Sequence, residues 1–389
     1  MLRIADRPAR AVVIAAGLVA VLGGCSRGST GDAAAAGQSG SPAASASSPC
    51  ADVVASASAA VQAATDVKAP WNGPTDGPKA AAGKTIVYVA QTLTNPGVAG
   101  NAKGVQEAGK AIGWNVRVID GQGDPSGIAA AMGQAIALKP DGIVVGGFDP
   151  GSVSAQIKQA ADAGIPIVGW HALATPGPSD NPKLFSNVTT KVEDVAKISA
   201  DYIIAKSGGK AGVVVFTDNS IPFAAGKAKM IEQELATCSG VKVLQEENIP
   251  IPDAGTRTPQ EFSSLVSKLG ADWNYSVAIN DLYFDNAATP LRAAGKQGNG
   301  APYNVGAGDG SEAAFQRIAS GQYQAATVPE PLNQEGWQIV DEFNRAFNKQ
   351  AASGYVPAVH VTDATNVGST TSWDPDNGYR DVYRKIWGK

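Results

Sequence analysis

The sequence has few of the residues on which metal chemistry and nucleophilic catalysis depend. Its 389 residues include 2 histidines and 3 cysteines, whereas a structural zinc site alone uses about four Cys or His ligands. The chain also lacks a Gly-x-Ser-x-Gly elbow, a phosphate-binding loop and the ligand spacing of a zinc motif. We therefore expect no metal, no cofactor and no enzyme activity.

An excess of basic charge is missing as well. The sequence holds 31 Lys and Arg against 35 Asp and Glu, a net charge of −4, and nucleic-acid binding needs basic side chains to release phosphate counterions. We expect no nucleic-acid partner. With 44% hydrophobic and 17% charged residues the chain can build a folded core. Its length is about two to three times that of a common domain, which favours two lobes plus appendages.

The N-terminus has the pattern of an export signal. Arg3, Arg7 and Arg10 precede an uncharged apolar run over residues 11–22, which is shorter than the about 20 residues that span a bilayer. We assign residues 1–24 to a signal peptide. Leu22-Gly23-Gly24-Cys25 resembles the lipobox of bacterial lipoproteins, which implies that Cys25 carries a lipid anchor. An ordinary secretory signal with an incidental cysteine is the alternative.

The segment that follows predicts a tether at the outer face of the cell membrane. Residues 25–49 are mostly Ala, Gly, Ser, Thr and Pro, which cannot bury enough apolar surface to fold. Residues 50–83 then contain a short helical pattern and a connector rich in Pro and Gly. In an oxidising compartment Cys50 and Cys238 are expected to pair, joining this segment to the second lobe; two free thiols are the alternative.

From residue 84 onward, short apolar strands alternate with amphipathic helical patterns. Apolar runs at 86–90, 116–119, 143–145 and 167–170 form one series, and a second series begins at 213–216. This alternation predicts an α/β protein with two similar lobes, each a parallel sheet covered by helices on both faces. Ligands of such sheets bind beyond the carboxyl ends of the strands, where this sequence places aromatic and polar residues suited to a small polar molecule.

Several motifs, in order and spacing, resemble the ribose-type periplasmic sugar-binding proteins of ABC importers. They are TLTNP at 92–96, DGIVV at 141–145, AGIPIV at 163–168, ND at 280–281, and the stretches 305–310 and 326–328. The resemblance implies the type I periplasmic binding protein fold, in which two lobes joined by a three-strand hinge close on a ligand. It assigns residues 84–186 plus 331–360 to lobe 1 and residues 187–330 plus 361–389 to lobe 2, with crossovers near Asn187, Glu330 and Val361.

The resemblance also implies site residues. Asn95 matches the first-lobe asparagine of the family, Asn280 and Asp309 match polar residues of the second lobe, and Glu330 stands where a hinge glutamine is usual. From their places at strand ends we add five candidate ligand contacts: Phe148, Trp170, His171, Asp281 and Tyr283. Phe223 is added as an aromatic surface at a position where the family has an arginine.

The sequence departs from the family pattern at three places. Gly97 and Val98 replace two aromatic residues, His171-Ala172 replaces an Asp-Arg pair, and Phe223 replaces an arginine. These changes remove charged and stacking contacts that the family uses for ribose. We therefore expect a sugar, a polyol or a related small polar molecule other than ribose.

These observations predict a monomeric solute-binding receptor that hands its ligand to the permease of an ABC transporter while anchored to the membrane through Cys25. Two alternatives remain open at this stage. A sensor subunit of a membrane kinase would bind the same ligand in the same cleft, and a hydrolase would use that cleft for catalysis.

Overall fold

The computed structural model describes residues 50–66 and 70–389. The predicted signal peptide, the lipid anchor at Cys25 and the tether lie outside the described residues. Within the described part of the chain, no helix has both the length and the apolar character needed to cross a bilayer.

The first lobe is built on a six-stranded sheet with the strand order β2-β1-β3-β4-β6-β5, in which only the pair β5 and β6 is antiparallel. Side chains of β1 alternate between its two faces: Ile86 and Tyr88 face a core shared with α2 and α10, and Val87 and Val89 face a core shared with α3 and α4. The elements are β1 (Thr85–Ala90), α2 (Pro96–Ile112), β2 (Asn115–Asp120), α3 (Pro125–Ala137), β3 (Gly142–Gly146), η1 (Pro150–Val153), α4 (Ser154–Asp162), β4 (Ile167–Trp170), β5 (Gly177–Asp180), β6 (Lys183–Val188) and α10 (Leu332–Phe347).

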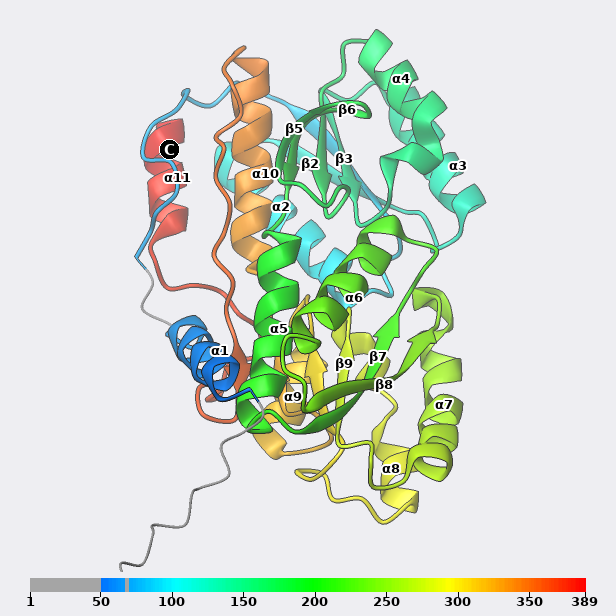
Figure 1. Cartoon of the computed structure of the whole chain (residues 1–389). Coiled ribbons are helices and arrows are strands. Elements are labelled where there is room, and N and C mark those ends of the chain that lie inside the picture. Colours follow the sequence, from blue (N-terminus) through cyan, green and yellow to red (C-terminus); the bar gives the residue numbers. More distant parts are fainter. Residues whose placement is uncertain (1–49, 67–69) are drawn as a thin grey trace, which may run out of the picture. The chain divides into compact units, whose positions relative to one another are not determined.

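The second lobe repeats this plan with the strand order β12-β11-β10-β9-β7-β8. Figure 1 shows β7, β8 and β9 of this sheet beside α6. One continuous core joins most of its strands and helices, and every residue of the interior strand β7 is buried. The predicted α/β class with two similar lobes is confirmed. The elements are α5 (Val192–Lys206), β7 (Ala211–Thr217), α6 (Pro222–Leu235), β8 (Val241–Asn248), η2 (Ile251–Asp253), α7 (Ala254–Leu269), β9 (Tyr275–Ala278), η3 (Asp281–Phe284), α8 (Ala288–Ala293), β10 (Tyr303–Gly306), α9 (Glu312–Ser320), β11 (Ala326–Thr327) and β12 (Thr362–Asp363).

The leading helix α1 (Ala51–Ala64) packs on the second lobe, beside α5 (Figure 1). Ala57 and Val61 are buried in the core of that lobe. At the start of the helix Cys50 forms a disulfide bond with the buried Cys238, and the two Cα atoms lie 5.2 Å apart. The leading segment is therefore held to the second lobe by a covalent bond and by apolar packing.

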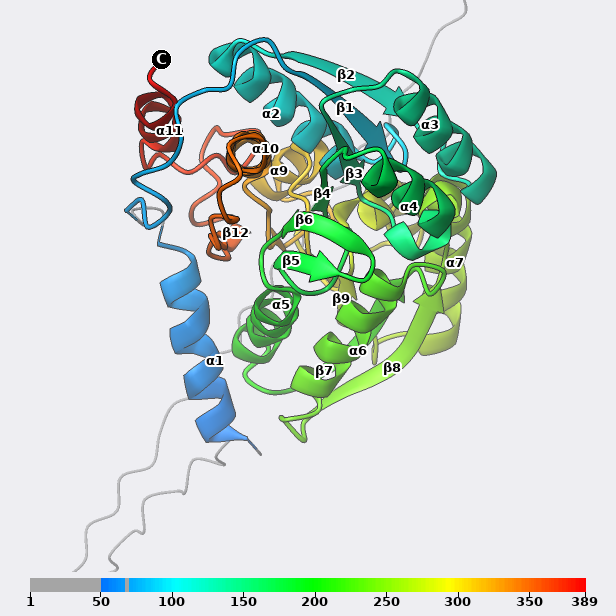
Figure 2. The ribbon, with the colours of Figure 1, turned by 90° about the horizontal axis from the view of Figure 1, so that it is seen from above.

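The C-terminal helix α11 (Tyr379–Trp387) differs from the sequence-based lobe assignment. We assigned all of residues 361–389 to the second lobe, but Tyr379, Tyr383 and Trp387 are buried in the core of the first lobe with Trp337 of α10. Figure 2 shows α11 on the same side as α2 and α10. The chain therefore passes once more between the lobes after β12, beyond the three crossovers that the resemblance implies.

Candidate functional site

A small cavity lies where the strand ends of the two lobes meet. Its volume is about 50 Å³, which is room for a few water molecules, whereas pockets that hold small organic ligands measure about 300–1,000 Å³. A ligand of sugar size therefore enters only when the lobes separate or side chains move. The cavity is lined by Gln91, Asn95, Val98, Gly147, Trp170, His171, Ile221, Phe223, Ala224, Lys227, Ile251, Ile279, Asn280 and Asp309.

On the first lobe, Asn95 is fixed by its position at the start of α2. Its side-chain oxygen accepts a hydrogen bond from the Gly97 backbone N–H at 3.0 Å, which caps the helix, and Pro96 occupies the first helical turn. Gln91 directly follows β1 and is buried, and its Oε1 has no hydrogen-bond partner in the described part of the chain. This unpaired acceptor is available to a ligand hydroxyl.

His171 lies between aromatic rings from both lobes. Its ring stacks on Trp170 with centroids 4.0 Å apart and an interplanar angle of 11°, and on Phe223 of the second lobe at 5.4 Å and 24°. The backbone of His171 has φ 48°, an uncommon conformation for a residue with a side chain. The His171 ring thus occupies space that a bound ligand would compete for.

On the second lobe, Asn280 and Asp309 meet each other and the first lobe. Asn280 follows β9, and its oxygen caps η3 by accepting from the Leu282 N–H at 2.9 Å. Its Nδ2 donates to the Asp309 carboxylate and lies 3.5 Å from Asn95 Oδ1. The Asn280 side chain therefore caps η3 and also contacts the first lobe.

The glycine at position 97 allows this close approach of the lobes. A Cβ atom placed there would collide with the carboxylate of Asp309. Any side chain at position 97 would therefore have to displace Asp309.

The site buries charges of both signs. Lys227 of α6 donates hydrogen bonds to the backbone oxygens of Ile279 at 3.2 Å and Ala307 at 2.7 Å, and burial lowers the pKa of its ammonium group. Burial raises the pKa of Asp309, although nearby His171 and Lys227 oppose the shift. These groups lie within about a Debye length of one another in a water-poor site, so their interaction is weakly screened.

Glu330 lies on the connection between β11 and α10. Burial by itself would raise its pKa, but attraction to His171 and Lys227 outweighs burial and lowers the pKa below its ordinary value. Glu330 Oε1 is 3.6 Å from His171 Nε2, and its Oε2 accepts from the Thr190 hydroxyl at 2.7 Å. Glu330 is therefore linked by an ion pair to His171, which lines the cavity.

Besides Glu330, three predicted contact residues lie outside the cavity wall. Phe148 is in the core between the first sheet and α3 and α4. Tyr283 is fully buried, and its hydroxyl donates to the Ile249 backbone oxygen at 2.7 Å. Asp281 accepts from the Gly310 N–H at 2.8 Å and from Thr327 Oγ1 at 3.0 Å. Asp281 therefore holds the loop that carries Asp309 without lining the cavity itself.

Three residues of the site were not predicted from the sequence: Gln91, Lys227 and Glu335. Gln91 directly follows β1, and ligands of this kind of sheet bind beyond the strand ends, so its position could have indicated a site residue. Lys227 and Glu335 lie inside amphipathic helices, where a charged residue is usually solvated. Both are buried, and Glu335 is fully buried, so only the packing of the lobes reveals them. Burial, together with repulsion from Glu330, raises the pKa of Glu335 well above its ordinary value.

Two α/β lobes with a cavity between their strand ends, lined by apolar residues and by buried polar groups from both lobes, define a cleft-type solute-binding protein. The sequence matches the periplasmic binding protein domain over residues 86–351, and the chain belongs to this family, among its ribose-type members.

Known relatives agree with this assignment. The ribose import binding protein of Salmonella typhimurium is 25% identical over 269 residues, which are 69% of this chain and 87% of that protein. Two solved structures share the fold. An ABC transporter solute-binding protein from Agrobacterium vitis with bound allitol has a TM-score of 0.63 and 21% identity, covering 73% of this chain and 97% of that one. Another from the same organism, bound to α-D-tagatopyranose, has a TM-score of 0.65 and 18% identity, covering 74% and 97%.

Proposed function

We propose that this protein is a sugar-binding receptor of an ABC importer. The observation that carries the proposal is the cavity between the lobes, because buried polar groups from both sides converge on it: Gln91 and Asn95 from the first lobe, and Lys227, Asn280 and Asp309 from the second. Amides and carboxylates in such an arrangement bind hydroxyl groups and reject ligands that leave them unpaired. The relatives named above import ribose or hold a sugar or polyol, which agrees with this chemistry.

The ligand that fits the departures from the family pattern is a sugar or polyol other than ribose. The aromatic side chains available to a sugar ring are Trp170 and Phe223, which now enclose His171. Rotation of the His171 ring out of this stack, together with separation of the lobes, would open a slot between two flat apolar surfaces. Such surfaces suit the C–H face of a sugar ring.

The proposal places the receptor at the outer face of the cell membrane. The sequence pattern around Cys25 supports a lipid anchor there, and the tether over residues 25–49 supports a receptor that reaches a neighbouring permease. A monomer is sufficient for this role, because both halves of the cavity come from one chain.

A thermal-shift panel tests the proposal. Purified protein is melted with monosaccharides, polyols, nucleosides and small acids. A ligand at a hundred times its Kd is expected to stabilise the folded state by about 2.7 kcal/mol. A shift with a sugar or polyol supports the receptor. No shift with any sugar or polyol contradicts it, and turnover of a panel member would instead favour an enzyme.

A further inference from the structure

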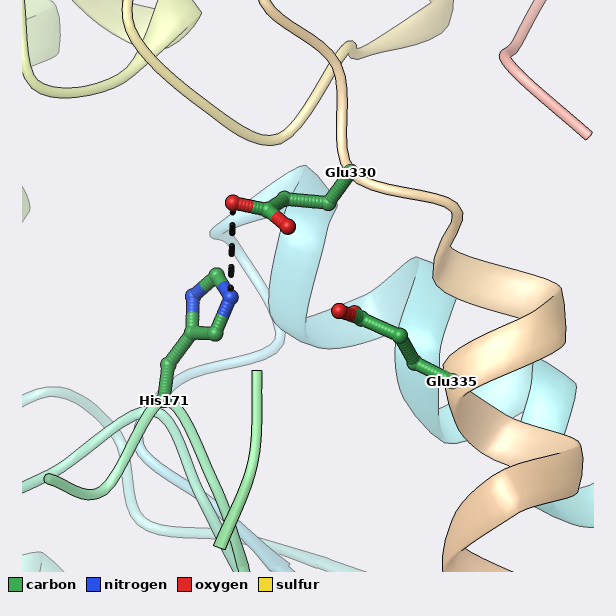
Figure 3. Close-up of side chains that lie close together, drawn as sticks. All are labelled: His171, Glu330 and Glu335. Atoms are coloured by element: carbon green, nitrogen blue, oxygen red, sulfur yellow. Dashed lines mark ion pairs between the residues drawn. The ribbon is translucent and has the colours of Figure 1, made fainter. Parts of the chain in front are cut away.

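A second cluster of buried side chains lies at the hinge, next to the cavity. It consists of His171 after β4, Glu330 on the connection between the lobes, and Glu335 in the first turn of α10 (Figure 3). All three residues are buried, and one ligand atom from each lies within 4.8 Å of the other two. Figure 3 shows the two carboxylates and the imidazole directed toward a common centre.

Each carboxylate in this cluster is held by a donor on its far side. The Thr190 hydroxyl donates to Glu330 Oε2 at 2.7 Å, and the Trp170 indole N–H donates to Glu335 Oε2 at 2.7 Å. These bonds use one oxygen of each carboxylate and fix its orientation. The second oxygen of each is left for another partner, which is the outer-shell arrangement that orients metal-binding carboxylates.

Two of the three atoms that face the centre lack hydrogen bonds among the described residues. Neither His171 Nε2 nor Glu335 Oε1 has a hydrogen-bond partner within residues 50–66 and 70–389. A fully buried carboxylate oxygen without a donor is rare, because burial removes the water that would otherwise pair with it. Two atoms without hydrogen bonds therefore lie on either side of a buried centre. This arrangement indicates a ligand that pairs with both atoms.

The spacing suits an ion pair or a shared metal ion rather than a direct hydrogen bond. His171 Nε2 and Glu330 Oε1 are 3.6 Å apart, which is longer than a hydrogen bond. Two ligands of a tetrahedral zinc ion with bonds of 2.0–2.2 Å lie about 3.4 Å from each other. One imidazole and two carboxylates are a donor set that divalent transition metals bind well.

We propose that His171, Glu330 and Glu335 form a binding site for a divalent transition-metal ion such as Zn²⁺. The ion accepts electron pairs from His171 Nε2, Glu330 Oε1 and Glu335 Oε1, and a water molecule or a ligand oxygen completes its coordination. The bound ion connects Glu330, on the link between the lobes, to two residues of the first lobe. Zn²⁺ binding therefore restrains the hinge and holds the His171 ring in place, so the ion competes with a sugar that needs this ring to move.

Zinc titration tests the site. Purified protein without a histidine tag is treated with EDTA, and Zn²⁺ binding is followed by calorimetry, with Co²⁺ absorption in the visible range as a second readout of coordination. We expect one Zn²⁺ per chain. Glu335→Gln keeps the shape of the side chain and is expected to weaken Zn²⁺ binding at least tenfold, as is His171→Asn.

Matched controls separate the site from other buried residues. Glu342 is a buried carboxylate on the same helix, and His360 is the other histidine of the chain. Glu342→Gln and His360→Asn are expected to bind Zn²⁺ as the unaltered protein does, and circular dichroism confirms that each variant is folded. Absence of stoichiometric Zn²⁺ binding, or unchanged affinity in folded Glu335→Gln, overturns the proposal. The metal-site proposal is also overturned if an amino sugar stabilises the protein and Zn²⁺ has no effect. The carboxylates of Glu330 and Glu335 would then pair with the ammonium group of the sugar.

Discussion

Glu342 is a buried carboxyl group in α10 that lies outside the ligand cavity. Its carboxylate accepts hydrogen bonds from the backbone N–H of Ser353 at 3.1 Å and from the Ser353 hydroxyl. Burial outweighs these bonds and raises the pKa of Glu342 to about 7. The folded protein therefore keeps a proton on Glu342 at pH values where the unfolded chain has released it.

This shift predicts how stability depends on pH. Because the pKa of Glu342 is higher in the folded state, its contribution to stability is fully present below about pH 4.5 and is lost as the pH rises through 7. The loss amounts to at most about 3 kcal/mol. Urea unfolding at pH 5 and pH 8 measures it. Glu342→Gln, which does not titrate, is expected to lose less stability than the unaltered protein over this range.

The control for this measurement is Glu312→Gln, which changes an exposed carboxylate in the first turn of α9. We expect it to follow the pH dependence of the unaltered protein. If Glu342→Gln does the same, burial of Glu342 does not set the pH dependence.

At the level of single residues, the sequence pointed to three positions in the loops after strands but not to Gln91, which directly follows β1. Asn95, Asn280 and Asp309 lie in short loops after strands, where the fold brings their side chains to the cavity. Tyr283 follows the same rule but points into the core, because η3 turns its side chain toward Phe216 and Ile249. A strand-end position indicates a residue near the site, whereas its direction depends on the turn that follows.

At the level of elements, α11 is the part of the fold that the family resemblance assigned to the second lobe but that packs on the first. Its sequence has the spacing of an amphipathic helix, with Tyr379, Tyr383 and Trp387 on one face. Such a face must be buried, but the pattern does not say against which lobe. The first lobe offers Trp337, whose ring stacks on Trp387 with centroids 5.4 Å apart and an interplanar angle of 6°.

Replacement of Trp387 by alanine tests this packing. The side chain is 1% exposed, and its indole N–H donates to the buried Asp341 Oδ1 at 2.9 Å. Its removal leaves a cavity against Trp337 and an unpaired acceptor, so Trp387→Ala is expected to lower the free energy of unfolding by about 3–5 kcal/mol. Urea denaturation measures the change.

Lys385→Ala, on the exposed face of the same helix, serves as the control and is expected to change stability by less than about 0.5 kcal/mol. Equal, small effects of Trp387→Ala and Lys385→Ala would show that α11 is not anchored in the first lobe.

At the level of the whole molecule, the lobes meet through a few side chains around the cavity. Asn280 approaches Asn95, Asp309 abuts Gly97, and Phe223 stacks on His171. The repeated α/β pattern predicted that a cleft would lie between the lobes. It did not predict a cavity as small as about 50 Å³, because its size depends on how side chains from distant parts of the chain meet when the lobes approach.

The most direct test of a ligand held between the lobes is calorimetric titration of the best sugar or polyol from the panel. Gln91 and Asp309 line the cavity from opposite lobes. Gln91→Ala and Asp309→Asn each remove a polar contact to the ligand, a loss of about 1–3 kcal/mol, or about 5- to 150-fold in Kd. We predict one binding site per chain and weaker binding in both variants, each of which remains folded. Unchanged affinity in either variant would contradict a ligand held by both lobes.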